Sequence, residues 1–162
     1  MATFQLDECL SARKLLRACA AEGVATVRPM PRRLKGSLDP TILATFMPAM
    51  SPLLTVDAAI ADEHCGDIPD HHPGIVIIAN APTVPQTMTV SIAQRILSRL
   101  KKDFREWHRT DLRNSILRVT QDGVEVSRVI DGSLQGRLVI SFSELNWTEK
   151  LSEVLRENAA NA

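Results

Sequence analysis

The sequence predicts an α/β domain with a mostly parallel central sheet and helices on both faces. Short apolar segments alternate with amphipathic segments through residue 108, which is the order expected of strand–helix–strand units. Residues 74–79 form a continuous run rich in β-branched side chains, as buried central parallel strands do. Near the end, Asp122-Gly123 separates two alternating apolar segments, which predicts a closing hairpin.

The first half of the chain supplies the predicted elements in order. Residues 3–7 are expected to form a strand, and apolar residues at helical spacing over 12–19 predict a helix that ends at Gly23. Residues 24–27 suggest a second strand, and the proline- and arginine-containing segment 28–38 suggests a loop. The next helix should begin at Asp39-Pro40, because an acidic cap followed by proline favours a helix start.

The second half begins with a short strand over 52–55 and a polar, irregular, exposed segment over 64–73. After the strand over 74–79, a long helix is expected over 90–107. The hairpin strands are expected over 115–120 and 124–129.

Two units follow from this order. Residues 1–130 form the α/β domain, and residues 131–162 form a C-terminal extension packed on the same domain or extending it. The extension is expected to contain a strand near 138–142 and an amphipathic helix from about Glu144, with residues 158–162 frayed.

The bulk composition is that of an ordinary globular domain. The chain has 162 residues, 44% of them hydrophobic and 23% charged, and a chain of that length buries one sizeable core. Its formal net charge is zero. A general nucleic-acid coat protein would be strongly basic, so that class is disfavoured, whereas a nuclease with acidic ligands is not.

The sequence favours a reducing cytoplasm. The chain has 3 cysteines, which cannot all pair in disulfides and show no C-x-x-C spacing. We find no segment approaching the roughly 20 apolar residues of a transmembrane helix, so no membrane association is expected. The first residues lack the basic start and apolar run of a signal peptide.

Acidic residues follow two of the predicted strands directly. Asp7 and Glu8 end the first strand, and Asp57 ends the strand over 52–55. Asp39 opens the helix between them. Ligands of parallel sheets bind at the carboxyl ends of the strands, and hard oxygen donors suit Mg²⁺ or Mn²⁺. Two further acids, Asp62 and Glu63, come one or two helical turns later.

Each of these carboxylates also has a structural explanation. Asp39 is placed to cap its helix, and Glu8 and Glu63 fit solvated surface positions. Asp7 and Asp57 are harder to explain without a ligand, because each directly follows an apolar strand at the presumed site edge.

The order of these motifs resembles the PIN-like proteins related to bacterial toxin–antitoxin ribonucleases. Residues 6–11 read LDECLS and precede an amphipathic helix and Gly23, where that subgroup has an LDENL-type start. Later segments read GVATV at 23–27, DPTIL at 39–43, TVD at 55–57 and GIV at 74–76. The hairpin over 116–129 is similar to the final strands of the subgroup. The resemblance covers about residues 3–130, and its order and spacing are more specific than any single motif.

The resemblance implies a metal-dependent ribonuclease, as in the toxin of a toxin–antitoxin pair. It places catalytic metal ligands at Asp7, Asp39 and Asp57, with Glu8, Thr55 and Asp62 as accessory residues. The ligands would hold Mg²⁺ or Mn²⁺ and activate a water to attack the scissile phosphate, and Thr55 would orient Asp57 or a ligand water. The partners implied are RNA, an antitoxin protein and a second copy of the chain. Basic residues of the loop before Asp39 would contact RNA phosphates, or are simply solvated: Arg32, Arg33 and Lys35.

The chain departs from the family pattern at three positions. Cys9 replaces the usual asparagine after the acidic pair, and Val56 replaces a basic residue between Thr55 and Asp57. Ala59 stands where the second acid of a D-x-D motif is usual. These departures leave three ligands rather than four, and they motivate the alternative of a PIN-like binding module without catalysis.

Other groups of residues in the chain could also indicate chemistry. Asp67, Asp70, His71 and His72 cluster before the strand over 74–79, but adjacent histidines usually point apart, which favours a polar loop over a zinc site. His64 with Cys65 lacks a base-orienting pattern for a cysteine nucleophile. A phospho-acceptor receiver domain also has acids after its first and third strands, but it needs a lysine after its fifth strand.

Overall fold

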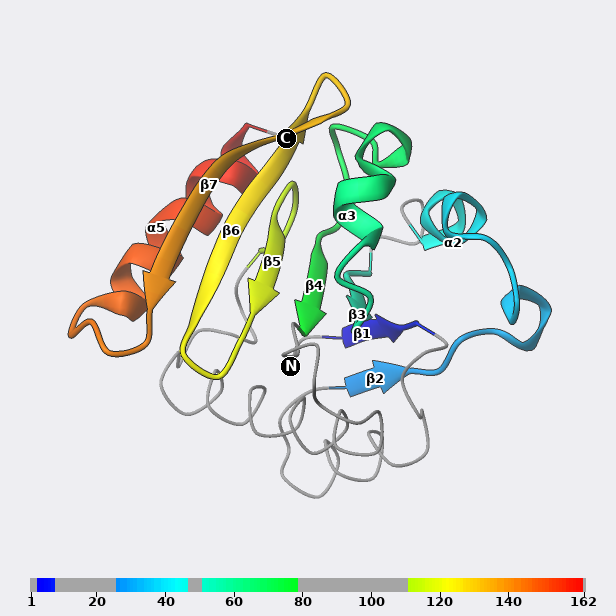
Figure 1. Cartoon of the computed structure of the whole chain (residues 1–162), viewed down its shortest axis with the longest axis horizontal. Coiled ribbons are helices and arrows are strands. Elements are labelled where there is room, and N and C mark those ends of the chain that lie inside the picture. The colour runs from blue at the N-terminus through cyan, green and yellow to red at the C-terminus, as the bar shows by residue number, and fades with distance from the viewer. Residues whose placement is uncertain (1–2, 8–25, 47–50, 79–110, 162) are drawn as a thin grey trace.

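The computed structural model describes residues 3–7, 26–46, 51–78 and 111–161. Seven strands form one sheet in the order β2-β1-β3-β4-β5-β6-β7 (Figure 1). They are β1 (Thr3–Leu6), β2 (Thr26–Arg28), β3 (Leu53–Thr55), β4 (Ile75–Ile78), β5 (Ile116–Val119), β6 (Gly123–Ile130) and β7 (Ser133–Ser141). The helices are α2 (Asp39–Phe46), α3 (Ile60–Glu63) and α5 (Trp147–Ala160), with 3-10 turns η1 (Arg32–Leu34) and η2 (Cys65–Asp67).

The sheet is mixed. Strands β2, β1, β3, β4 and β5 run parallel to one another, whereas β6 pairs antiparallel to β5 and β7 pairs antiparallel to β6. The predicted α/β class is therefore confirmed, while the parallel part ends at β5. The order β2-β1-β3-β4-β5 is one of the two common orders of doubly wound sheets, whose ligand sites lie at the carboxyl ends of the strands.

One face of the sheet packs against α2 and α3. Ile42 and Leu43 of α2 and Ile60 of α3 are almost fully buried. They form one cluster with alternate side chains of the central strands, among them Leu53, Ile75, Ile77 and Ile116. Burying each such side chain contributes about 1.5–3 kcal/mol. Asp39 is the first residue of α2, the helix that this layer packs against the sheet.

The opposite face of β5, β6 and β7 is covered by α5, which lies behind these strands in Figure 1. Trp147, Leu151 and Leu155 are buried on the helix, at a four-residue spacing that places them on one face of an amphipathic helix. The Trp147 ring packs on Phe142 with 4.8 Å between ring centroids. The segment 131–162 thus adds a strand and a helix to the same sheet.

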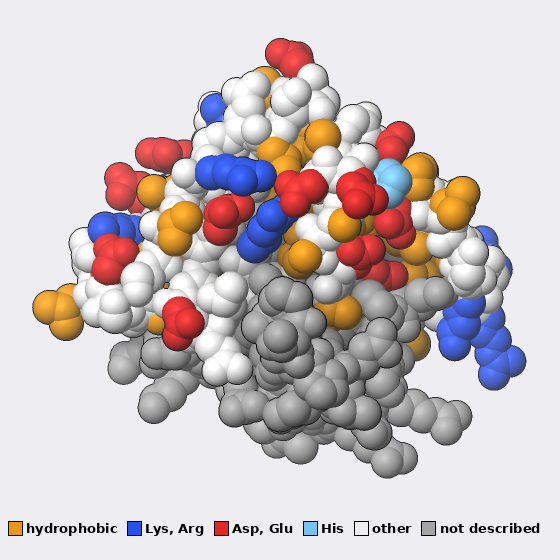
Figure 2. All heavy atoms as spheres, in the orientation of Figure 1, with side chains coloured by type: hydrophobic (Ala, Val, Ile, Leu, Met, Phe, Trp, Pro, Cys, Tyr) orange, Lys and Arg blue, Asp and Glu red, His pale blue; other side chains and the backbone are white. Residues whose placement is uncertain are grey.

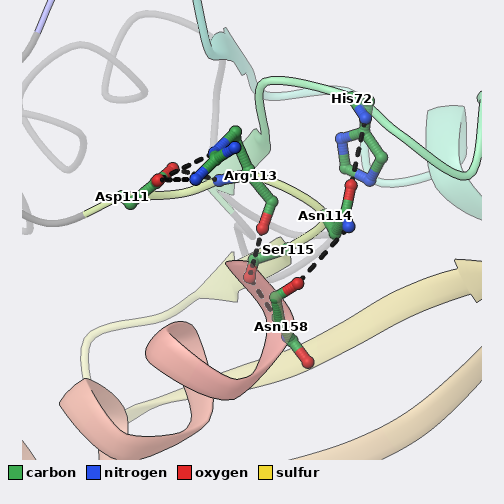
Figure 3. Close-up of polar contacts among 6 residues, drawn as sticks. All are labelled: His72, Asp111, Arg113, Asn114, Ser115 and Asn158. Carbon is green, nitrogen blue, oxygen red and sulfur yellow. Dashed lines mark hydrogen bonds and ion pairs between the residues drawn. The ribbon is translucent and has the colours of Figure 1, made fainter. Parts of the chain in front are cut away.

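Buried amides connect the end of α5 to the loops that enter β4 and β5 (Figure 3). Asn114 accepts a hydrogen bond from the backbone N–H of His72 at 3.1 Å and donates to the carbonyl of Asn158 at 3.3 Å. Asn158 in turn donates to the Ser115 hydroxyl at 3.1 Å. The expectation that residue 158 is frayed is therefore wrong, because its amide is buried and bonded to the sheet.

The segment over 64–73 is also less exposed than its polar sequence suggested. Ile68 and His72 are each 3% exposed, so this part of the expectation is wrong. Ile68 joins the core cluster beside α3, and His72 lies beneath the loop that precedes β5. Polar composition indicated a loop correctly but could not show which of its residues turn inward.

The predicted hairpin of β5 and β6 is confirmed, with Val119 opposite Val124. Gly123 lies within β6, where an added Cβ would stand 2.4 Å from the carbonyl oxygen of Ile140. Its role is therefore close backbone approach rather than turn conformation. A second tight turn at Asp131 (φ 50°) and Gly132 (φ 70°) begins β7 at Ser133, earlier than expected, because two positive φ angles suit a two-residue hairpin.

The expected helices over 12–19 and 90–107 lie outside the described residues. Among the helices that are described, none has both the length and the apolar character required to cross a bilayer.

Candidate functional site

Asp7 and Thr55 meet at the carboxyl ends of β1 and β3. The backbone N–H of Asp7 donates to the Leu54 carbonyl at 3.0 Å, which continues the pairing of the two strands. The Asp7 side chain is only 6% exposed, and its Oδ2 accepts a hydrogen bond of 2.7 Å from the Thr55 hydroxyl. A buried carboxylate requires such donors, because removal from water penalises its charge. The prediction that both residues lie at one sheet edge is consistent with this geometry.

Asp57 is held beside this pair by two backbone hydrogen bonds. Its N–H donates to the Thr55 hydroxyl at 3.0 Å, so that one hydroxyl connects both aspartates. The Asp57 Oδ1 accepts from the N–H of Ala59 at 2.9 Å, which is the geometry of an Asx turn. The turn fixes the Asp57 side chain at the site edge and leads into α3. Ala59 therefore contributes a backbone donor at the position where the family pattern has a second acid.

Asp39 enters the same electrostatic environment from α2. Burial raises the pKa of Asp39, and the negative charges of Asp57, Asp7 and Glu63 raise it further, opposed by His64. Among the described contacts its carboxylate makes no capping hydrogen bond. The Leu38 carbonyl accepts the first hydrogen bonds of the helix, from the N–H groups of Thr41 and Ile42. The structural explanation of Asp39 as a cap therefore receives no support.

His64 is a site neighbour that sequence reasoning missed. Its Nε2 lies 3.4 Å from Asp39 Oδ2, and its Nδ1 lies 3.4 Å from Asp67 Oδ2. The imidazole therefore lies between the carboxylates of Asp39 and Asp67. No residue spacing along the chain indicates this, because Asp39 and His64 come from different helical segments.

The three residues expected to be accessory, Glu8, Thr55 and Asp62, differ in their relation to the site. Thr55 is central to the site, as described above. Asp62 points to the other side of α3, where it pairs with Arg118 at 2.7 Å and Arg137 at 3.3 Å. Glu8 and Cys9 lie outside the described residues.

Basic side chains flank the acidic ones on this face. In Figure 2, Asp and Glu side chains and a histidine gather over α2 and α3, with Lys and Arg side chains at the η1 edge and over the β5–β7 half. On η1, buried Leu34 anchors the turn, while Arg32, Arg33 and Lys35 are exposed. The basic loop predicted from the sequence is therefore accessible to solvent.

The carboxylate oxygens suit a hard divalent cation, but in the described residues the side chains are not close enough together to coordinate one. The three aspartates offer carboxylate oxygens. Burial raises the pKa of Asp39, and the negative charges of Asp57 and Asp7 add to this effect; a bound cation relieves such repulsion. Across the described segments, however, no three His, Cys, Asp or Glu side chains are close enough to share a metal ion.

In the loop before β4, the structure indicates a packing role for His72 rather than a metal site. His72 is buried, and its Nδ1 accepts from the Gly74 N–H at 3.2 Å. Burial lowers the pKa of His72 to about 4. Its neighbours His71 and Asp70 are exposed, so the group does not converge on one point.

Cys65 is a free thiol whose Sγ lies 3.8 Å from the Asp62 carbonyl.

Comparison of the chain with protein-family models, curated proteins and solved structures found no match. What the fold and the site define is thus a class: a mixed α/β sheet of doubly wound order with aspartates gathered at the carboxyl ends of β1 and β3.

Proposed function

We propose that this protein is a metal-dependent ribonuclease of the PIN-like type. The observation that supports it most is the joining of Asp7 and Asp57 through the Thr55 hydroxyl, with Asp39 close enough for their charges to raise its pKa. The three carboxylates lie where doubly wound sheets bind ligands, and a bound cation would relieve their mutual repulsion.

Within this proposal the aspartates have distinct parts. Asp7 and Asp57 are held by hydrogen bonds before any ligand arrives, so they would form the fixed side of a Mg²⁺ or Mn²⁺ site. Asp39, paired with His64 over 3.4 Å, would complete it. When bound, such an ion supplies Lewis acidity to phosphodiester oxygens and lowers the pKa of a water. Thr55 would keep the Asp7 carboxylate oriented.

RNA cleavage in the presence of Mn²⁺ tests this function directly. The variants Asp7→Asn and Asp57→Asn retain an oxygen that accepts the existing hydrogen bonds while losing the charge. We expect cleavage by the wild type and at least a hundredfold loss in either variant, on the order of the effect of removing a principal electrostatic contributor. Asp70→Asn, at an exposed carboxylate of the neighbouring loop, is the matched control. Cleavage that survives both site variants would exclude this site.

A receiver-type phospho-acceptor is a second candidate, because the strand order β2-β1-β3-β4-β5 is also that of receiver domains. Its chemistry needs a lysine after the fifth strand, whereas β5 carries Arg118 and continues into Thr120-Gln121. Arg118 pairs with Asp62 rather than Asp57. We therefore expect no mass increase at Asp57 after incubation with acetyl phosphate and Mg²⁺.

The remaining alternative is a PIN-like module that binds RNA or an antitoxin protein without cleaving. It is favoured by Ala59 in place of an acid and by the open distances among the described carboxylates. Intact folding with neither Mn²⁺ binding nor RNA cleavage would select this alternative.

A further inference from the structure

Two arginines from separate strands converge on one carboxylate beside the candidate site. Arg118 of β5 and Arg137 of β7 both reach Asp62 of α3, with 2.7 Å from Arg118 Nη2 to Oδ2 and 3.3 Å from Arg137 Nη2 to Oδ1. Each oxygen of the carboxylate therefore faces a different guanidinium. Two guanidinium groups that share one oxyanion form the arrangement in which arginines bind phosphate.

The hydrogen bonding of this group is incomplete. Arg118 Nη2 is ion-paired with Asp62 Oδ2, whereas within the described residues Arg118 Nε is buried without a hydrogen-bond acceptor. Glu125 Oε1 is likewise buried without a donor and lies 3.9 Å from Arg137 Nε. A purely structural ion-pair network would satisfy its buried donors. Arg118 Nε therefore retains a donor for a ligand oxygen.

The position of the two arginines relative to the aspartates follows from strand register. Thr55, Ile77, Arg118 and Glu125 are successive partners across β3, β4, β5 and β6, so they lie in one row on the same face. Neighbouring strands are about 4.8 Å apart, which places Arg118 about 10 Å from Thr55 along the row. No described helix crosses the front of β6 and β7, where Arg137 is 55% exposed (Figure 1).

The arrangement on this face therefore has three parts in sequence. The η1 segment, with its exposed basic residues, lies beyond α2 on the side away from β5–β7 (Figure 1), whereas the two arginines belong to β5 and β7. A polyanion that lies across the aspartates meets positive charge on both sides. Backbone phosphates, unlike bases, present the same charge at every step of a strand, so such contacts position RNA without reading its sequence.

We propose, on the basis of the nuclease function proposed above, that Arg118 and Arg137 bind a backbone phosphate of single-stranded RNA. Asp62 occupies the phosphate position when RNA is absent. Its side chain is 46% exposed, and exposed ion pairs are weak, so an RNA phosphate displaces it. Asp62 is thus a competitor for the arginines rather than a metal ligand.

The test is binding of a short fluorescent oligouridylate in EDTA, followed by anisotropy over a series of salt concentrations. Arg137→Gln is the principal variant, because this side chain is mostly exposed and its removal leaves the core intact. Its affinity should fall several-fold, and the slope of log K against log salt should become shallower by about 0.7, the loss of one phosphate contact to single-stranded RNA. Arg118→Gln should behave in the same way.

Two matched controls isolate the site. Arg156→Gln removes an exposed arginine on α5, behind the sheet, and should leave affinity and slope unchanged. Asp62→Asn should raise the affinity several-fold, whereas Glu153→Gln on α5, which makes the same change of net charge, should not.

The outcomes distinguish this inference from the nuclease function, because the assay contains no metal and needs no cleavage. If Arg137→Gln binds RNA as wild type does, or if wild type does not bind the oligonucleotide, the phosphate site is excluded. Reduced binding by Arg137→Gln in a protein that never cleaves RNA would support the site and reject the nuclease. Reduced stability without reduced RNA binding would show that the arginines only brace α3.

Discussion

A buried hydrogen bond of 2.7 Å joins the Thr55 hydroxyl of β3 to the Asp7 carboxylate at the end of β1. The same hydroxyl accepts from the backbone N–H of Asp57 at 3.0 Å. One side chain therefore sets the positions of two candidate ligands that are 50 residues apart in sequence, from Asp7 to Asp57. The two aspartates are held in place by protein contacts and do not depend on a cation to bring them together.

Replacing Thr55 by valine should destabilise the fold. Valine keeps the shape of the side chain but loses the hydrogen bonds of the hydroxyl to the Asp7 carboxylate and from the Asp57 N–H. We expect the free energy of unfolding to fall by about 1–3 kcal/mol, the range for leaving buried polar groups without partners. Urea denaturation measures it. Thr55→Ser keeps the hydroxyl and should lose less, so equal stability of the two variants would show that the hydrogen bonds contribute little.

Asp39→Asn should stabilise the protein. Because the pKa of Asp39 is raised, the folded state binds its proton more tightly than the unfolded state does. The carboxylate therefore opposes folding above that pKa, and the opposition disappears as pH falls through it. At pH 8 we expect the variant to gain about 0.2–1 kcal/mol, the scale of exposed charge pairs. Asp70→Asn should have no such effect, and a less stable Asp39→Asn would mean that the pairing with His64 outweighs the repulsion.

Stability should fall with acid through His72. Burial lowers its pKa from 6.5 to about 4. Between these two values the unfolded state binds a proton on this side chain and the folded state does not. The contribution is fully present above pH 6.5 and is lost as pH falls toward 4, with a limiting slope of about 1.4 kcal/mol per pH unit. Protonation would also remove the acceptor that Nδ1 offers to the Gly74 N–H.

The measurement is the free energy of unfolding between about pH 5 and pH 7, above most carboxyl titrations. The variant His72→Gln should show a shallower slope than wild type, whatever its absolute stability. His71→Gln, at the exposed neighbouring histidine, should keep the wild-type slope. Identical slopes for all three proteins would assign the acid sensitivity to other groups.

Asn158→Ala tests whether α5 is fastened to the sheet by its buried amide (Figure 3). The change removes the donor to the Ser115 hydroxyl, which is itself fully buried. A loss of about 1–3 kcal/mol in unfolding free energy is expected. Asn161→Ala, at an exposed amide three residues later, is the control. Equal stability of the two variants would indicate that packing of Trp147, Leu151 and Leu155 alone holds the helix.

Hydrophobic patterning was sufficient for strands β1 to β6 and for the body of α2, because each has a continuous or periodic apolar face. The buried strand β4 illustrates this, whereas the start of α2 was predicted from Asp39-Pro40. Patterning failed where inward and outward residues alternate without a period, as at Ile68 and His72 in the loop before β4. It also missed the start of β7, where the turn at Asp131 and Gly132 decides the pairing.

The candidate site was predictable to the extent that strand ends determine it. Asp7 and Asp57 follow parallel neighbours, so their proximity is a consequence of topology. His64 could not be found in this way, since its contact with Asp39 depends on how α3 and α2 pack. The same limitation applies to Asp62, whose partners Arg118 and Arg137 come from strands more than 50 residues later in the chain.

The most direct test of the metal-dependent nuclease is Mn²⁺ titration calorimetry on wild type and on Asp57→Asn. The asparagine keeps an oxygen for the Ala59 N–H, so the turn that follows β3 should remain folded. We predict saturable binding by the wild type that disappears in Asp57→Asn and persists in Asp70→Asn. A folded wild type that binds no Mn²⁺, or binding that Asp57→Asn leaves unchanged, would contradict the metal site.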